Sequence, residues 1–167
     1  NLRSFKYAMI NTPIGELMLI QSDKGLKQII FEKKIPAFKS QIELNKNRLS
    51  FVKDEVSLNK TIQQINEYFL RKRREFQIKI DISMPPFYQQ ALSVVMKIPY
   101  GEVRSYKEIA QFTQNPSAYR AVGTANAKNL IPIIIPCHRV IANNGTLGGY
   151  GGGLKIKKYL LKMEGVI

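Results

Sequence analysis

The chain has 167 residues, 44% of them hydrophobic, which is enough apolar material for one ordinary domain or two small ones. It carries 26 lysines and arginines against 12 acidic residues, a formal net charge of +14. This composition excludes a disordered chain, and no apolar run approaches the roughly 18 residues of a membrane span. One cysteine and one histidine exclude an internal disulfide and a structural zinc cluster of the usual kind. No apolar signal segment follows the charged start, so we expect a cytoplasmic protein with no membrane partner, no metal and no cofactor.

The positive charge is shared by both halves of the chain but arises differently in each. Residues 1–83 hold 16 basic and 9 acidic residues, whereas residues 84–167 hold 10 basic and 3 acidic residues. After Ser105 the only side-chain carboxylates are those of Glu108 and Glu164. A surface so poor in acids attracts polyanions, and nucleic acid is the partner that it favours. A basic surface that serves only solubility is the alternative.

The pattern of the first half predicts a small antiparallel sheet. Strands are expected at 5–10, 16–21 and 26–32, and the turn at 22–25 joins the last two into a hairpin in which its glycine takes a positive φ. Another half-buried strand is expected at 75–82, where apolar and polar residues alternate.

The same half is expected to hold a helix that ends in a basic run. Apolar residues recur at helical spacing from Leu58 to Phe69, with Ser57 or Asn59 as the N-cap. Four consecutive cations follow at 71–74 and suit the negative end of the helix dipole, with contact to DNA as the alternative. Residues between this helix and the hairpin lack a clean period, and we expect a loop at 36–57 with one helix near 37–47.

The second half has the pattern of a helical domain. Met84-Pro85-Pro86 separates it from the strand-rich half, so we expect one domain at 1–83 and another at 84–167. A helix is predicted at 87–97. Ser105 and Glu108 form a capping box that opens a short helix ending near residue 112.

A second short helix is expected from Ser117, as its cap, to about Lys128. Two short helices joined by a tight turn in an acid-poor region indicate a helix-turn-helix, although many helix pairs share this pattern. Ala121, Gly123, Ala125 and Ala127 keep this helix slim, and a glycine inside a helix costs about 1 kcal/mol against alanine. The small residues allow close approach to another helix or to a DNA groove, and a bulky residue at 125 or 127 is expected to weaken binding to duplex DNA.

Residues 133–141 place the only cysteine beside the only histidine in an apolar segment that we expect to be a strand. A lone cysteine is usually a small hydrophobe, but a thiol beside a titratable base is what a thiolate nucleophile needs. Neighbours in an extended chain point in opposite directions, so a water is expected to bridge Cys137 and His138. A thiolate at neutral pH also requires a thiol pKa below the free value of about 8.5.

Several motifs of the second half, in the same order, resemble those of the O6-alkylguanine-DNA alkyltransferases, also called methylated-DNA–protein-cysteine methyltransferases. They are Gly101–Tyr106, Arg120–Gly123, Asn129, Pro136–Val140, Gly148–Leu154 and Glu164-Gly165. The first half resembles the family's variable N-terminal domain only in outline. The resemblance implies an α+β protein with a ribonuclease H-like N-terminal domain, built from an antiparallel sheet and a helix. It implies a mainly helical C-terminal domain with a helix-turn-helix and the active-site cysteine.

The resemblance also implies a DNA repair enzyme that acts once. It would flip O6-alkylguanine out of the duplex, with O4-alkylthymine as a further candidate substrate, and transfer the alkyl group irreversibly to Cys137. His138 would take the thiol proton through a water, and Glu164 would orient His138. Asn129 would tie the helix-turn-helix to the backbone around Cys137.

The remaining implied roles concern substrate and DNA. The substrate-binding set is Tyr106, Val140, Tyr150, Gly151 and Gly152, in which the Tyr106 hydroxyl would bind the guanine ring. The DNA-binding set is Arg120, Ser105, Tyr119, Ala121, Gly123, Thr124, Ala127 and Lys128, in which Arg120 would fill the gap left by the flipped base. The implied partner is double-stranded DNA containing O6-alkylguanine, bound through its minor groove by a monomer, which would be nucleoid-associated in a prokaryote.

Some features depart from the family pattern, and others fit a purely structural role. Three glycines follow Tyr150, where the family often has a small hydroxyl residue first, so the entrance is expected to admit bulkier alkyl groups. Taken alone, Tyr106 fits a core residue, Glu164 a solvated helix residue, and the glycines a flexible loop. Two other functions are a non-catalytic protein that flags alkylated bases, whose known examples lack the acceptor cysteine, and a cysteine hydrolase, for which no separate oxyanion motif is found.

Overall fold

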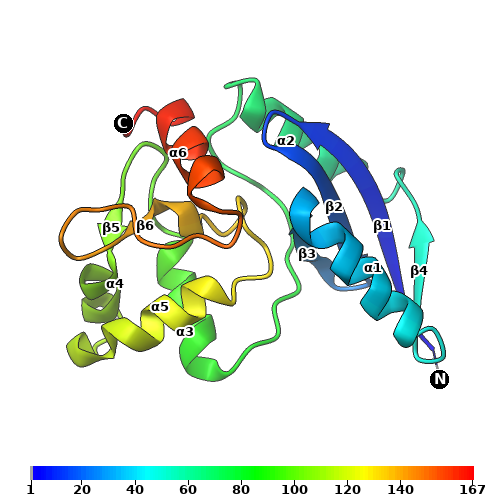
Figure 1. Cartoon of the computed structure of the whole chain (residues 1–167), viewed down its shortest axis with the longest axis horizontal. Helices are drawn as coiled ribbons and strands as arrows, with labels where there is room; N and C mark the ends of the chain where they lie inside the picture. The colour runs from blue at the N-terminus through cyan, green and yellow to red at the C-terminus, as the bar shows by residue number, and fades with distance from the viewer. Residues whose placement is uncertain (1) are drawn as a thin grey trace. The chain divides into compact units, whose positions relative to one another are not determined.

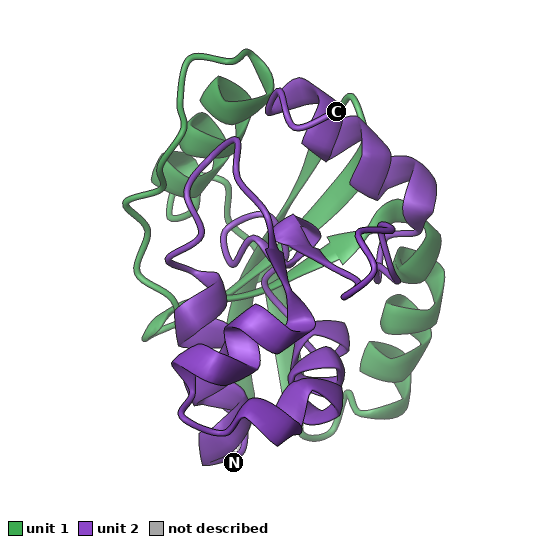
Figure 2. Cartoon of the chain, turned by 90° about the vertical axis from the view of Figure 1, so that its left-hand side faces the viewer, with its two compact units in different colours: residues 1–81 green, residues 82–167 purple. Residues whose placement is uncertain are grey.

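A computed structural model describes residues 2–167, which divide into two compact units, one up to Asp81 and one from Ile82 to Ile167 (Figure 2). The first unit contains a four-stranded sheet with two α-helices, and the second is mainly helical (Figure 1). The α+β class predicted from the sequence is therefore confirmed. In the described residues no helix is long and apolar enough to cross a bilayer.

The sheet of the first unit has the strand order β3-β2-β1-β4. Its members are β1 (Arg3–Thr12), β2 (Gly15–Ser22), β3 (Gly25–Phe31) and β4 (Leu49–Lys53). The predicted hairpin is β2–β3, and Gly25 has the expected positive φ of 146°. A Cβ there would lie 2.6 Å from the carbonyl oxygen of Lys79, so the position excludes any side chain.

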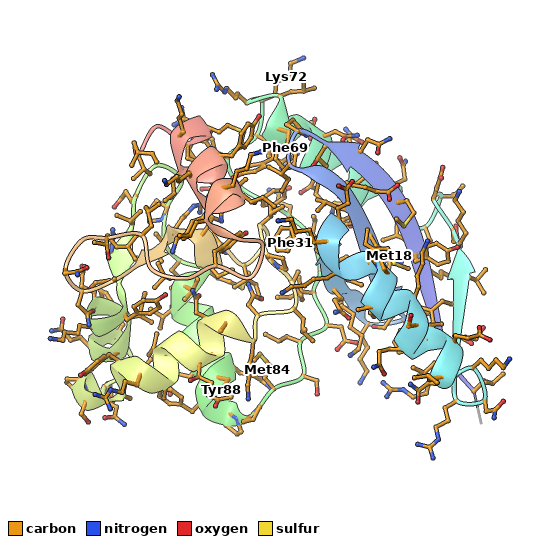
Figure 3. The ribbon with its side chains drawn as sticks, in the orientation of Figure 1. Met18, Phe31, Phe69, Lys72, Met84 and Tyr88 are labelled. Carbon is orange, nitrogen blue, oxygen red and sulfur yellow. The ribbon has the colours of Figure 1, made fainter. Side chains whose placement is uncertain are left out.

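The sheet is mixed rather than antiparallel as predicted, because β4 pairs parallel with β1. This strand was expected to be loop, since its five residues are too few to show a clean period and its last two are exposed. Two helices flank it in the chain, α1 (Ile35–Leu44), which follows a short 3-10 turn at Glu32–Lys34, and α2 (Asn59–Phe69). Met18 and Phe31 lie among the side chains of the sheet (Figure 3), where the core cluster consists of Phe5, Met18, Ile20, Ile30 and Ile35.

Two other predictions for this unit are wrong. No side chain caps the N-terminus of α2, where Leu58 occupies the cap position. The segment 75–82 is not a strand, apart from a single bridge between Ile80 and Leu26. Instead, the Gln64 side chain donates to and accepts from the backbone of Gln77, which satisfies that backbone without a ladder.

The second unit is built from α3 (Pro86–Val95), α4 (Tyr106–Phe112), α5 (Tyr119–Ala127) and α6 (Leu154–Met163). Shorter elements are the strands β5 (Arg104–Ser105) and β6 (Val140–Ile141), which pair in parallel, and the 3-10 turns at Pro116–Ala118 and Cys137–Arg139. The predicted capping box is present, since the Ser105 side chain accepts from the Glu108 N–H and the Glu108 carboxylate from the Ser105 N–H.

The two short helices α4 and α5 pack against each other, as expected for a helix-turn-helix (Figure 1). Ser117 is not the cap of α5. It lies inside the preceding 3-10 turn and donates to the Asn115 side chain, and Ala118 occupies the cap position. The turn between the helices is therefore longer and more structured than the sequence indicated.

Candidate active site

The Cys137–Arg139 segment forms a 3-10 turn and not the strand that was predicted. Pro136 precedes it, and Val140 returns to the extended conformation to start β6. All three residues of the turn are buried, with exposed fractions of 5% for Cys137 and 0% for His138. The prediction that Cys137 and His138 point in opposite directions, as neighbours in a strand do, therefore does not apply, because the turn changes their relative orientation.

His138 is paired with Glu164, the residue that follows α6. Its Nε2 lies 2.7 Å from Oε2 of Glu164, and both side chains are fully buried. Burial lowers the pKa of His138, although the Glu164 carboxylate acts in the opposite direction. A neutral imidazole next to a carboxylate must donate from Nε2, so Nδ1 carries the lone pair. That Nδ1 is buried and has no hydrogen-bond partner within residues 2–167, which leaves it available as a base.

Arg139 holds the other side of Glu164. Its Nε and Nη2 donate to the two carboxylate oxygens at 2.8 and 3.0 Å, and its Nη1 donates to the Ile98 carbonyl oxygen at 2.7 Å. Its guanidinium also lies over the Tyr100 ring. Burial alone would raise the pKa of Glu164, but the hydrogen bonds from His138 and Arg139 outweigh it and lower this pKa to about 2. Glu164 is therefore a carboxylate at every working pH.

The thiol is neutral in this structure. Burial raises the pKa of Cys137 to about 11, although the Asn129 side chain and the charge of Lys157 act in the opposite direction. Burial therefore opposes the low thiol pKa that a thiolate at neutral pH would require. The nucleophile has to be formed by transfer of its proton to a base, and the Nδ1 of His138 is the candidate.

Two asparagines tie the active-site segment to α5. Asn129 follows this helix, donates to the Ile135 carbonyl oxygen at 3.0 Å and accepts from the Ile131 N–H at 3.0 Å. Asn126, on α5, donates to the Cys137 carbonyl oxygen at 3.1 Å. The geometry agrees with the tie expected from Asn129, whereas Asn126 was not anticipated.

Tyr106, the first residue of α4, lies between α5 and the loop that precedes α6. A Cβ at Gly123 would be 3.9 Å from one edge of its ring, and a Cβ at Gly148 would be 3.3 Å from its hydroxyl oxygen. Gly148 has a φ of +71°, which favours glycine. Burial and the nearby Cys137 raise the pKa of Tyr106, so its hydroxyl keeps its proton.

Lys157 fixes the loop after β6 from inside the fold. Its side chain on α6 is buried, and Nζ donates to the carbonyl oxygens of Val140 at 2.7 Å, of Gly149 at 3.1 Å and of Leu147. Burial lowers the pKa of Lys157 to about 8, while the nearby Cys137 acts in the opposite direction, so the group is an ammonium at neutral pH. The cation therefore anchors the segment that holds the predicted substrate-binding glycines.

The predicted DNA-binding residues lie on α4, α5 and their termini. Arg120, Thr124, Ala127 and Lys128 are exposed, whereas Ser105, Tyr119, Ala121 and Gly123 are half-buried. Lys107 lies over the Tyr119 ring, and Lys128 lies over the ring of Tyr88 on α3. Ala125 is fully buried, so a bulky residue there would disturb the packing of α5 rather than contact with a DNA groove. Of the two positions at which a bulky residue was predicted to weaken DNA binding, only the exposed Ala127 can test that prediction.

The structure also places the remaining predicted residues. Val140 is buried and begins β6, Tyr150 and Gly152 are half-buried, and Gly151 is exposed. The imidazole of His138 faces the Tyr150 ring in a T-shaped arrangement with centroids 6.5 Å apart. Across residues 2–167 no group of three or more His, Cys, Asp or Glu side chains could hold a metal ion.

Three residues of the site were not predicted from the sequence: Asn126, Arg139 and Lys157. A signal existed for two of them. Lys157 stands three and four residues before Leu160 and Leu161, which puts a lysine on the apolar face of its helix. Asn126 similarly shares the buried face of α5 with Val122 and Ala125.

Both units match known protein families. Residues 5–82 match the family described as 6-O-methylguanine DNA methyltransferase, ribonuclease-like domain, and residues 86–166 match 6-O-methylguanine DNA methyltransferase, DNA binding domain. The chain belongs to the 6-O-methylguanine DNA methyltransferase family. The resemblance found in the second half of the sequence is thereby confirmed, and it extends to the first half.

Individual relatives of this methyltransferase chain agree over nearly their full lengths. The methylated-DNA–protein-cysteine methyltransferase of Methanosarcina acetivorans is 42% identical over 159 residues, which cover 95% of this chain and 97% of that protein. The constitutive enzyme of the same name from Bacillus subtilis is 35% identical and covers 95% and 94%. The crystal structure of the Mycobacterium tuberculosis O6-methylguanine methyltransferase matches with a TM-score of 0.83 at 36% sequence identity. The crystal structure of the same organism's OGT in complex with DNA matches with a TM-score of 0.82 at 35% sequence identity. Both cover 96% of this chain and 92% of theirs.

Proposed function

We propose that this methyltransferase repairs DNA by taking the alkyl group from O6 of guanine onto Sγ of Cys137, once per molecule. The observation that carries the assignment is the buried His138–Glu164 pair next to the only cysteine of the chain. A protein that only flags alkylated bases needs no acceptor thiol, whereas this chain has Cys137. No second thiol or histidine exists to cleave a thioether, so the product is final.

The reaction balances with the groups present. The proton of the Cys137 thiol passes through a water to Nδ1 of His138, and Glu164 stabilises the imidazolium through its Nε2–H. Sγ then attacks the alkyl carbon, the C–S bond forms, and the C–O6 bond breaks with its electron pair going to the guanine ring. The guanine anion takes up a proton from water as the His138 imidazolium releases one, so the leaving group departs as neutral guanine. The hydroxyl of Tyr106 donates to the ring as this charge develops, and its raised pKa keeps it a donor.

The substrate base has to leave the duplex, because O6 lies inside the base stack. The protein binds DNA, and we assign the contact with the minor groove to the exposed face of α5, where Arg120 would fill the gap and Ala127 would permit close approach. Lys157 and the positive φ of Gly148 support the proposed role of the loop at 150–152, because they fix the backbone that precedes it.

We further propose that residues 84–167 form the catalytic and DNA-binding domain, that residues 1–83 form a separate domain, and that the protein works as a monomer. Its place of action would be the compartment that holds the DNA, the cytoplasm, in association with the nucleoid in a prokaryote. The positive charge spread over both halves supports contact with DNA from either.

Intact mass spectrometry tests the function. The protein is incubated in parallel with duplex DNA containing O6-methylguanine and with free O6-benzylguanine, and Cys137→Ser is treated in the same way. We expect a single stable alkyl addition to the wild-type protein and no addition to Cys137→Ser. No addition would indicate a protein that only flags damage, and continued release of product would indicate a hydrolase.

A further inference from the structure

Asn126 is a polar side chain on the inner face of α5. Its exposed fraction is 8%, and it lies between the buried Ala125 and the exposed Ala127. Its Nδ2 donates to the Cys137 carbonyl oxygen at 3.1 Å, a contact between residues eleven positions apart in the chain. The helix that presents Arg120 to solvent is therefore bonded directly to the backbone of the nucleophile.

The Cys137 carbonyl does not need this bond in order to be satisfied. The Val140 N–H also donates to it and closes the 3-10 turn at Cys137–Arg139. Without Asn126 the carbonyl oxygen would still accept one hydrogen bond. The second donor restricts the orientation of the peptide plane that links Cys137 to His138, and with it the two groups that exchange the proton.

The same side chain carries a cost in stability. Its Oδ1 is buried and has no hydrogen-bond partner within residues 2–167. Reversing the amide would not help, because Oδ1 would then face the Cys137 carbonyl oxygen, an acceptor against an acceptor. A buried acceptor without a partner is destabilising, and an apolar side chain of similar size would avoid this. Packing alone would therefore favour leucine at this position.

We propose that Asn126 is a positioning residue for the alkyl transfer, which fixes the Cys137–His138 peptide against α5 at the expense of stability. The inference rests on the proposed function, since it assigns Asn126 to that reaction. It also explains why both asparagines bond the backbone of the segment 131–137: Asn129 contacts Ile131 and Ile135, and Asn126 contacts Cys137.

Asn126→Leu tests the proposal, with Thr113→Val as the matched control. Thr113 is likewise buried at a helix end of this unit and donates to the Ala110 carbonyl oxygen, and neither of these residues is part of the proposed machinery. Three quantities are measured for each full-length protein: the melting temperature, the Kd for unmodified duplex DNA, and the rate constant of alkyl transfer at saturating duplex. The same rate is measured with free O6-benzylguanine.

For Asn126→Leu we expect transfer to slow by about 3- to 10-fold on both substrates, the range of a single hydrogen bond, with an unchanged Kd and an unchanged or higher melting temperature. Thr113→Val should keep the wild-type rate. A wild-type rate in Asn126→Leu would overturn the proposal, as would a loss of rate that appears only with a fall in melting temperature. If leucine prevents folding, Asn126→Ala replaces it and the same outcomes apply. A wild-type protein that transfers no alkyl group would instead refute the proposed function.

Discussion

Glu164→Gln is the substitution that tests the catalytic geometry most directly. The two oxygens of Glu164 accept from His138 and from two nitrogens of Arg139. Arg139 has only donors, so the glutamine must turn its carbonyl oxygen to Arg139 and its NH₂ to His138. His138 would then accept at Nε2 and carry its proton on Nδ1, the nitrogen that has to receive the proton of Cys137.

The expected effect has a kinetic and a thermodynamic part. An imidazole held in the wrong tautomer slows catalysis by up to about 10⁴-fold. The buried guanidinium of Arg139 also loses its counter-charge, and breaking a buried pair in this way costs about 3–5 kcal/mol of folding stability. Below its ordinary pKa of 4.5, and down to about 2, the wild type should lose this stabilisation as Glu164 gains a proton. Glu164→Gln should lack this contribution, so its stability should fall less over that range than the stability of the wild type, since Asp54 and Asp81 titrate in both proteins.

The assay is the rate of benzylation of Cys137 by free O6-benzylguanine, followed by intact mass well below the melting temperature of each variant. Glu102→Gln is the matched control, because Glu102 pairs with Arg104 at the surface of the same unit at 2.9 Å. It should change neither rate nor stability by much. A folded Glu164→Gln protein that reacts within about tenfold of wild type would refute the proposed change of tautomer.

Three other results are expected. Arg120→Ala should slow repair of duplex DNA strongly and barely change the rate with free O6-benzylguanine, whereas Tyr106→Phe should slow both; equal losses for Arg120→Ala would contradict a role in base flipping. Gly148→Ala should reduce transfer, because its Cβ would lie 3.3 Å from the Tyr106 hydroxyl at a φ of +71°, and Gly149→Ala, with nothing within 4 Å, should not; similar rates for the two variants would count against this. Without DNA, iodoacetamide should alkylate Cys137 about tenfold faster per pH unit up to near pH 11, since only the thiolate reacts, and a plateau near pH 8 would show that its pKa is not raised.

The parts of the fold that were predicted correctly depend on local patterns. The β2–β3 hairpin follows from a turn with a glycine at positive φ, and the start of α4 from the Ser105–Glu108 capping box. Both signals act within a few residues, so the sequence contains them directly. Tertiary contacts decide the failures. The segment 75–82 alternates like a strand, yet a side chain from α2 satisfies its backbone.

The site was predictable where a family motif exists and not where the chemistry depends on burial. The pairing of His138 with Glu164 followed from the resemblance, and the geometry agrees with it. The sequence showed that a thiolate would need a low thiol pKa, but the direction of the pKa shift depends on how deeply Cys137 is buried, which no local pattern encodes. Arg139 stands inside the recognised motif, but its bond to Ile98 joins residues 41 positions apart and only the fold reveals it.

The two glycines at opposite edges of the Tyr106 ring are subject to different constraints. At 148 the fold itself excludes a larger residue, through the φ of +71° and the 3.3 Å approach to the phenol. At 123 a methyl group would meet the ring at 3.9 Å, an ordinary contact, and alanine would stabilise the helix by about 1 kcal/mol. Nothing inside the protein therefore requires glycine at 123. Variation at 148 would be limited by folding, whereas variation at 123 would be limited by the shape of the molecule against which α5 docks.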